Sequence, residues 1–297
     1  AYGNYNRHVC IILYALVATL WFLPQGRRKT TLAGVMLLVL FGIKITGFLL
    51  GLGLVVHATM AGQMRWRSLG ALLATLGVAL LVFNTATGAV TAYLADIASL
   101  VAMNKGSLLG RFLTVASLEF DVLAGGALLV LALGLSQWRE IASAGPILSV
   151  GFLTALASSQ AARILVPLVG GALFESQNTG SQEFIFLWPM LLTVVIAWWR
   201  RPDAARPLVL FLVVATILPH AMKILHRTAR AVASAPIYLP LAAPELGGLG
   251  RVSAKRELMA RADILLEHYV THRSAYTALS DRNELPSAIV FSEIDYQ

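Results

Sequence analysis

The chain contains 297 residues, of which 58% are hydrophobic and only 13% are charged, whereas soluble domains carry about 25% charged residues. Together with a mean hydropathy of +0.74, this composition excludes a water-soluble fold and favours a protein with many membrane spans. The net charge of +8 does not indicate nucleic-acid binding. Nine of the 23 basic residues lie in short connections between apolar segments. Residues 226–297 hold eight basic and eight acidic residues, a balance that does not favour binding to a phosphate backbone.

Long apolar stretches predict membrane-spanning helices, since a span needs about 17–25 mainly apolar residues and lipid offers backbone polar groups no partner outside the helix. Eight such stretches occur at residues 9–24, 31–44, 47–62, 69–90, 121–136, 146–166, 184–199 and 207–225. The sequence therefore predicts an all-α polytopic membrane protein, with about eight transmembrane helices within residues 1–230.

The second and third stretches together fill residues 31–61, which is too long for one ordinary span and barely enough for two. We expect a tight hairpin of short helices over residues 31–62 that turns at Lys44 to Gly47. One long and steeply tilted helix is the alternative.

Basic residues predict the orientation, because Lys and Arg in short connections stay on the cytoplasmic side. They occupy four alternate connections as Arg27, Arg28, Lys29, Arg65, Arg67, Arg139, Arg200, Arg201 and Arg206. We therefore expect these connections in the cytoplasm, and both ends of the chain on the extracytoplasmic side of the plasma (inner) membrane.

Residues 91–120 form the first sizeable outer segment. Its apolar residues would lie along one side of one or two helices that rest in the membrane interface, with Lys105 and Arg111 directed at lipid headgroups. Alternatively, these two cations hold a phosphate or diphosphate of a lipid-linked substrate, since a partly desolvated anion is best held by more than one cation.

Two further cations lie within apolar segments, where a charge costs about 2.5–3.5 kcal/mol on insertion scales and is normally paired or functional. Lys44 at the hairpin turn either snorkels to the interface or binds a lipid phosphate or an intramembrane carboxylate. Arg163 follows Ser158, Ser159 and Gln160 near the expected outer end of the sixth span. This polar run either lines a cavity or packs polar helices together.

Four carboxylates are expected at the same outer level. Glu119 and Asp121 precede the fifth span, while Glu175 and Glu183 flank the loop before the seventh. They could bind a divalent cation or act as a base, or they could be solvated caps favoured by helix dipoles. The single Cys10 and the six His residues have no zinc-site spacing, so no metal site is assigned.

Residues 231–297 predict an incomplete extracytoplasmic domain. A Pro- and Gly-rich connector over residues 235–250 precedes an amphipathic helix at about residues 253–272 and a strand at residues 287–295, which together indicate the start of a small α/β domain. Because the chain begins at Ala1 and stops just after the strand, we expect a fragment that is cut at both ends.

Several short segments carry a family resemblance. They are Tyr5, Asn6 and Arg7 before the first span, then Lys44, Ile45, Thr46 and Gly47 in the hairpin, then Arg65, Trp66 and Arg67. With the tail after the last span, this pattern resembles the membrane portion of a bacterial glycosyltransferase of the GT-C superfamily. Enzymes of this family take sugars from polyprenyl-phosphate carriers on the outer face of the membrane.

The resemblance implies that an outer carboxylate deprotonates an acceptor hydroxyl and that the polyprenyl phosphate leaves, held by cations. The candidate phosphate holders are Lys44, Lys105, Arg111 and Arg163. The family keeps its catalytic acid in the first outer loop, which is expected upstream of Ala1. No catalytic residue is therefore transferred, and Glu119 and Asp121 do not occupy the family's position.

Two other functions remain open. A transporter or flippase for a lipid or sugar conjugate would also need polar groups near the middle of the membrane. Such proteins often contain inverted repeats with paired broken helices. Here one break is expected at Lys44 to Gly47, with no counterpart in the second half. A non-catalytic membrane scaffold would use the tail for docking. The missing repeat and the outer domain favour the enzyme, a hexosyl- or pentosyltransferase that uses a lipid-linked sugar donor.

Overall fold

The computed structural model describes residues 4–103, 108–176, 184–201, 203–234, 238–241, 252–255 and 271. These residues contain eleven α-helices, one 3-10 helix and two short strands. The chain divides into two compact units, Ala1–Leu225 and His226–Gln297, close to the boundary at residue 230 that the sequence predicts. The fold class of the first unit is all-α, as expected.

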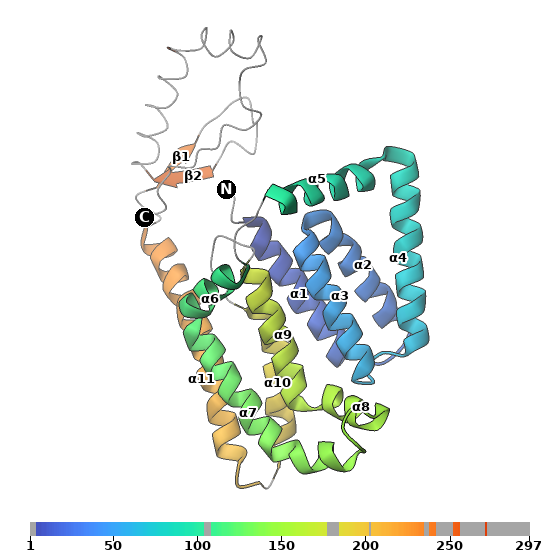
Figure 1. Ribbon diagram of the computed structural model, residues 1–297. Helices are drawn as coiled ribbons and strands as arrows, with labels where there is room; N and C mark the ends of the chain where they lie inside the picture. The colour runs from blue at the N-terminus through green and yellow to red at the C-terminus, as the bar shows by residue number, and fades with distance from the viewer. Residues whose placement is uncertain are drawn as a thin grey trace. The chain divides into compact units, whose positions relative to one another are not determined.

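The first unit opens with four helices that pack side by side. Contacts join α1 to α2 and α3, and α4 packs on the outer side of α2 (Figure 1). The helices are α1 (Asn4–Phe22), α2 (Arg27–Ile43), α3 (Ile45–Met60) and α4 (Trp66–Thr87).

Residues 31–62 contain parts of two helices, α2 and α3, that meet at Lys44, where the sequence predicts the turn of a hairpin. Only Lys44, in an extended conformation with φ −163° and ψ 121°, separates α2 from α3. A Cβ atom on Gly47 would lie 3.5 Å from Leu40, and one on Gly51 would lie 3.0 Å from Leu37. These pairs show that the two helices run antiparallel. The two glycines allow α2 and α3 to approach closely. The alternative, one long tilted helix over the same residues, would have no such contact.

Two helices occupy the predicted interfacial segment: α5 (Ala89–Met103) and α6 (Leu108–Leu118). Gly88 ends α4 in the left-handed conformation, with φ +68°, and α5 then crosses above the ends of the neighbouring helices instead of continuing α4 (Figure 1). The apolar side chains of Leu100, Val101 and Leu109 are 59%, 69% and 66% exposed. This exposure agrees with a helix pair that rests against lipid.

The second half of the first unit contains a broken helix. α7 (Phe120–Ser143) is followed by α8 (Val150–Ser158) and α9 (Gln160–Glu175), and α8 and α9 are bent by 74° at Ser159. The expected single span at residues 146–166 is therefore wrong. The Ser159 hydroxyl accepts a hydrogen bond from the Ala162 amide and caps a new helix, which the polar run in the sequence also permits.

This break also corrects the expectation that the hairpin turn has no counterpart in the second half of the chain. A short 3-10 helix η1 (Ile185–Leu187) then leads into α10 (Trp188–Trp199), and α11 (Arg206–Ser234) follows. The last helix continues beyond the expected end at residue 225, although Pro219 lies inside it.

Three helices are long and apolar enough to cross a membrane: α4, α7 and residues 206–230 of α11. The bent pair α8 and α9 makes a fourth if it is one broken span. Within the described residues this is fewer than the eight spans expected, because the helices in the other predicted ranges are short: α2, α3 and α10 have 17, 16 and 12 residues, and the apolar part of α1 covers only residues 6–22.

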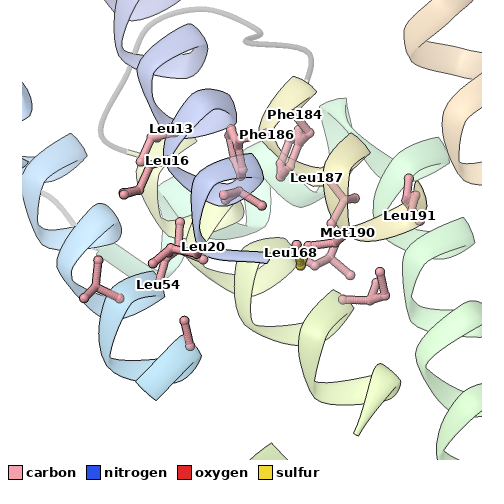
Figure 2. Close-up of a cluster of buried hydrophobic side chains, with 14 of the residues drawn as sticks. Leu13, Leu16, Leu20, Leu54, Leu168, Phe184, Phe186, Leu187, Met190 and Leu191 are labelled. Carbon is pink, nitrogen blue, oxygen red and sulfur yellow. The ribbon is translucent and has the colours of Figure 1, made fainter. Parts of the chain in front are cut away.

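The core of the first unit lies where α1, α3, α9, η1 and α10 meet. Figure 2 shows Leu13, Leu16 and Leu20 of α1, Leu54 of α3, Leu168 of α9, and Phe184 and Phe186, all members of one cluster of buried side chains. Both phenylalanines and Leu13 are fully buried. By contrast, α4 exposes Val78 and Leu81 by 60% and 61%, as a helix facing lipid would.

The helix connections that carry basic residues meet at one end of the first unit. Gln25 Nε2 donates a 2.6 Å hydrogen bond to the Gly62 carbonyl. Lys29 Nζ donates to the carbonyls of Leu20 and Gln63 at 2.8 and 3.0 Å. These bonds join the connection between α1 and α2 to that between α3 and α4.

The remaining two basic connections lie at the same end. His57 Nε2, near the end of α3, lies 3.0 Å from the Ala157 carbonyl at the end of α8. Arg201, after α10, pairs with Glu140 near the end of α7 at 3.8 Å. The four connections therefore gather at one end of the helices (Figure 1), as the charge pattern predicts.

In the second unit, the described residues include β1 (Tyr238–Leu241) and β2 (Val252–Lys255), which pair antiparallel. The helix expected at residues 253–272 is therefore wrong at its start, where the chain is paired in a hairpin. The expected strand at residues 287–295 lies outside the described residues.

Candidate functional site

The end of the helices opposite the basic connections carries a polar cluster around Lys44. The Lys44 ammonium donates a 2.9 Å hydrogen bond to Asn6 Oδ1, in the first turns of α1. This bond brings together two segments that lie 38 residues apart in the sequence. Asn6 is buried, and Lys44 is partly exposed.

The end of α9 supplies the rest of this cluster. Lys44 Nζ lies 5.4 Å from the centre of the Phe174 ring. The Glu175 side chain is buried and interacts electrostatically with Lys44 and Cys10. Glu175 thus brings a negative charge close to the Lys44 ammonium.

An apolar groove of about 670 Å³ leads away from the cluster between α3 and α9. Its lining includes Thr46 and Phe174 beside the cluster and runs along both helices as far as Leu165. Leu49 and Leu173 in its walls are 57% and 45% exposed, so the groove opens toward the side of the molecule that would face lipid.

The groove ends at the first turn of α3. Lys44 is the N-cap residue but makes no side-chain cap, and the first amides of a helix have no partner within it and carry partial positive charge. The Thr46 hydroxyl is buried, and no partner for it is found among the described residues. An amine, a helix N-terminus and a hydroxyl therefore converge where the groove ends.

We name the residues Asn6, Lys44, Thr46 and Glu175 the Lys44 cluster. It has the features needed to hold an amphipathic anion: an apolar groove for a hydrocarbon chain, positive charge for a phosphate, and a carboxylate that can accept a proton. The sequence singled out Lys44 and Glu175 separately, but only the packing of α3 against α9 places them side by side.

A second polar cluster joins α7 to α11. Lys223 Nζ lies 2.9 Å from Glu119 Oε2 and 3.6 Å from Asp121 Oδ2. The Glu119 side chain is only 4% exposed, so it is not the solvated cap that was one expectation. Lys223 compensates the charge that these two carboxylates would otherwise offer to a cation.

His220 lies next to this ion pair in α11 and is fully buried. Its Nδ1 accepts a 3.2 Å hydrogen bond from Trp188 Nε1, and its ring stacks on Phe184 with centroids 6.0 Å apart. Because Nδ1 is the acceptor, Nε2 carries the proton of a neutral ring. Its partners Trp188 and Phe184 lie far from His220 in the sequence, so only the folded chain brings the three rings together.

Arg163 lies elsewhere than expected. It is in the first turn of α9 and interacts electrostatically with His57, which is 13 residues after Lys44 in the same helix and so about 20 Å away along its axis. Because α9 begins at the break and ends at Glu175, Arg163 lies toward the end with the basic connections. It is not part of the Lys44 cluster.

Of the other candidate residues, Arg111 is partly buried in α6, a helix that packs on α9. Lys105 and Glu183 lie outside the described residues. Within the described part of the chain, no three His, Cys, Asp or Glu residues are grouped as they would be to hold a metal ion.

No family model, curated protein or solved structure matches this chain.

Proposed function

We propose that this protein is an integral membrane glycosyltransferase that moves a sugar from a polyprenyl-phosphate carrier to an acceptor on the outer face of the membrane. The observation that supports it is the Lys44 cluster at the end of the apolar groove between α3 and α9. A polyprenyl chain would lie in the groove, and its phosphate would lie at Lys44.

The orientation forms part of this proposal. With the basic connections in the cytoplasm, the Lys44 cluster faces the extracytoplasmic side of the plasma (inner) membrane, as do both ends of the chain. Lipid-linked donors on that face would enter sideways from the bilayer, through the exposed side of the groove.

The residues of the cluster then have separate roles. The Glu175 carboxylate takes the proton of the acceptor hydroxyl, whose oxygen attacks the anomeric carbon of the sugar. The bond between that carbon and the phosphate oxygen breaks, and its electron pair stays on the polyprenyl phosphate. Lys44 and the first turn of α3 stabilise the charge on this leaving group.

The test is turnover of a polyprenyl-phospho-sugar with radiolabelled sugar by the protein in proteoliposomes. We expect Lys44→Ala to lower kcat/KM by about 100-fold, as loss of one group that stabilises a developing charge does. We expect Glu175→Gln to lower it by about 100-fold or more, as loss of a general base does. Lys44→Arg, which keeps the charge, should retain part of the activity.

Arg139→Ala is the control, because it removes an exposed cation at the opposite end and should leave turnover unchanged. Wild-type turnover in both the Lys44→Ala and the Glu175→Gln variants would exclude the Lys44 cluster from the chemistry.

A transporter or flippase for the same class of lipid is the second candidate, and the break between α8 and α9 favours it. Together with the hairpin turn at Lys44, this break gives each half of the first unit an interrupted helix, as in many transporters. In proteoliposomes a flippase would move the labelled lipid between leaflets with the bond between sugar and phosphate intact. A non-catalytic scaffold would neither cleave nor move it.

A further inference from the structure

A pocket of about 470 Å³ lies at the basic end of the first unit, between the starts of α2 and α4. It is lined by Arg27, Lys29, Arg65 and Arg67 and by the polar residues Thr30 and Ser68. No Asp or Glu is among the lining residues, all of which belong to the described part of the chain. The pocket therefore has a high positive charge with no carboxylate in its wall.

Two helix N-termini add to this charge. Gly26 and Arg65 are the N-cap residues of α2 and α4, and neither makes a side-chain cap. Both line the pocket, so the first amides of two helices and their partial positive charges lie at its wall. The hydrogen bond from Gln25 to Gly62 holds the two starts together.

The pocket continues into an apolar crevice beside α2 and α4. A second hollow of about 210 Å³ shares Thr30, Thr31 and Ala71 with the basic pocket. A third, of about 530 Å³, shares Leu38 and Ala79 with the second and ends under α5. The three hollows thus form one path from a basic head to an apolar tail.

The length of this path fits a lipid chain. Along α2 it runs from Thr30 to Gly42, which is about 18 Å at 1.5 Å per residue. One leaflet accounts for about half of the 30 Å hydrocarbon core, so a chain that enters at the basic end would reach past the middle of the bilayer.

We propose that this path binds one anionic phospholipid, with its phosphate among Arg27, Arg65 and Arg67 and an acyl chain in the crevice between α2 and α4. Basic pockets between membrane helices on the cytoplasmic side select anionic headgroups, and one guanidinium group can bind two phosphate oxygens at once. The apolar crevice distinguishes a lipid from free phosphate. This site lies at the opposite end of α2 and α3 from the Lys44 cluster and does not depend on the proposed enzymatic function.

The test uses the whole chain, purified in a neutral detergent, and native mass spectrometry to measure retention of added lipid. We expect phosphatidylglycerol to bind, phosphatidylcholine to bind weakly, and inorganic phosphate alone to give no stable complex. Arg65→Ala combined with Arg67→Ala should weaken phosphatidylglycerol binding by about 30-fold. Both arginines are exposed, so their removal leaves the core intact.

Arg139→Ala combined with Arg200→Ala is the matched control, since it removes two exposed cations from the same end but outside the pocket. Ala71→Trp tests the apolar part, because Ala71 lines both the head pocket and the crevice; it should reduce lipid binding with every arginine present. Equal losses in the pocket and control pairs, equal retention of the two phospholipids, or full retention in Ala71→Trp would each overturn the proposal.

Discussion

The Lys44 ammonium and the Asn6 carboxamide are joined by a 2.9 Å hydrogen bond across 38 residues of sequence. This bond fixes the first turns of α1 to the turn between α2 and α3. Glu175, the last residue of α9, interacts electrostatically with Lys44. The bond to Asn6 therefore also determines where the lysine charge lies relative to the end of α9.

Asn6 variants test the role of this bond. Asn6→Ala removes the acceptor and should cost about 1.5–3 kcal/mol of unfolding free energy, as for other hydrogen bonds to charged groups. Asn6→Asp keeps an acceptor and should retain stability, but its negative charge should raise KM for a polyprenyl-phospho-sugar. Unfolding in mixed micelles and donor titrations measure the two effects. Equal stability of all three proteins would show that the bond does not hold the turn.

Gly51 and Gly53 offer a matched pair within α3. A Cβ atom on Gly51 would lie 2.9 Å from Leu40, 3.0 Å from Leu37 and 3.2 Å from Leu16, and all three leucines are fully buried. Gly51→Ala should therefore destabilise the protein by about 1–3 kcal/mol through overpacking.

Gly53 has no atom within 4 Å of the same position, so Gly53→Ala should be neutral or stabilise the helix by up to about 1 kcal/mol. Unfolding in mixed micelles compares the two variants. An equal effect of both would contradict the close antiparallel packing of α2 and α3.

The ion pair between Lys223 and Glu119 should respond unequally to loss of either partner. The Glu119 side chain is 4% exposed and that of Lys223 is 31% exposed. Lys223→Met would leave a buried carboxylate without its cation and should cost about 3 kcal/mol. Glu119→Gln leaves a lysine that still reaches water and Asp121, and should cost less.

The double variant of these two residues should recover part of the loss, because it removes both charges. Unfolding free energies of the four proteins give this coupling directly. Strict additivity would mean that the two side chains do not interact.

The sequence predicted the all-α fold and the approximate positions of most helices of the first unit, because long apolar stretches are typical of membrane helices, but it predicted more spans than the described helices provide. It also predicted the turn at Lys44, where 31 residues had to be divided into two short helices. The break at Ser159 was missed because its polar neighbours were interpreted as a cavity wall, although Ser159 is also a good N-cap.

The candidate site could be predicted only in part. Lys44 and Glu175 stood out as charges at the ends of apolar segments, but their proximity depends on how α3 packs against α9. Glu119 is a second example. Its sequence context resembles a solvated cap, and only the position of Lys223 on α11 explains its burial.

The orientation can be tested by cysteine labelling. Cys10 is the single cysteine of the chain and is 3% exposed, so the protein without an added cysteine should not react with a maleimide. In intact spheroplasts, an impermeant maleimide should label the Thr271→Cys variant and should not label Arg200→Cys until the cells are opened. Both positions are exposed in their own units, so access depends on the side of the membrane. Labelling of Arg200→Cys in intact spheroplasts, with Thr271→Cys protected, would place the Lys44 cluster in the cytoplasm, where it could not act on a donor at the outer face.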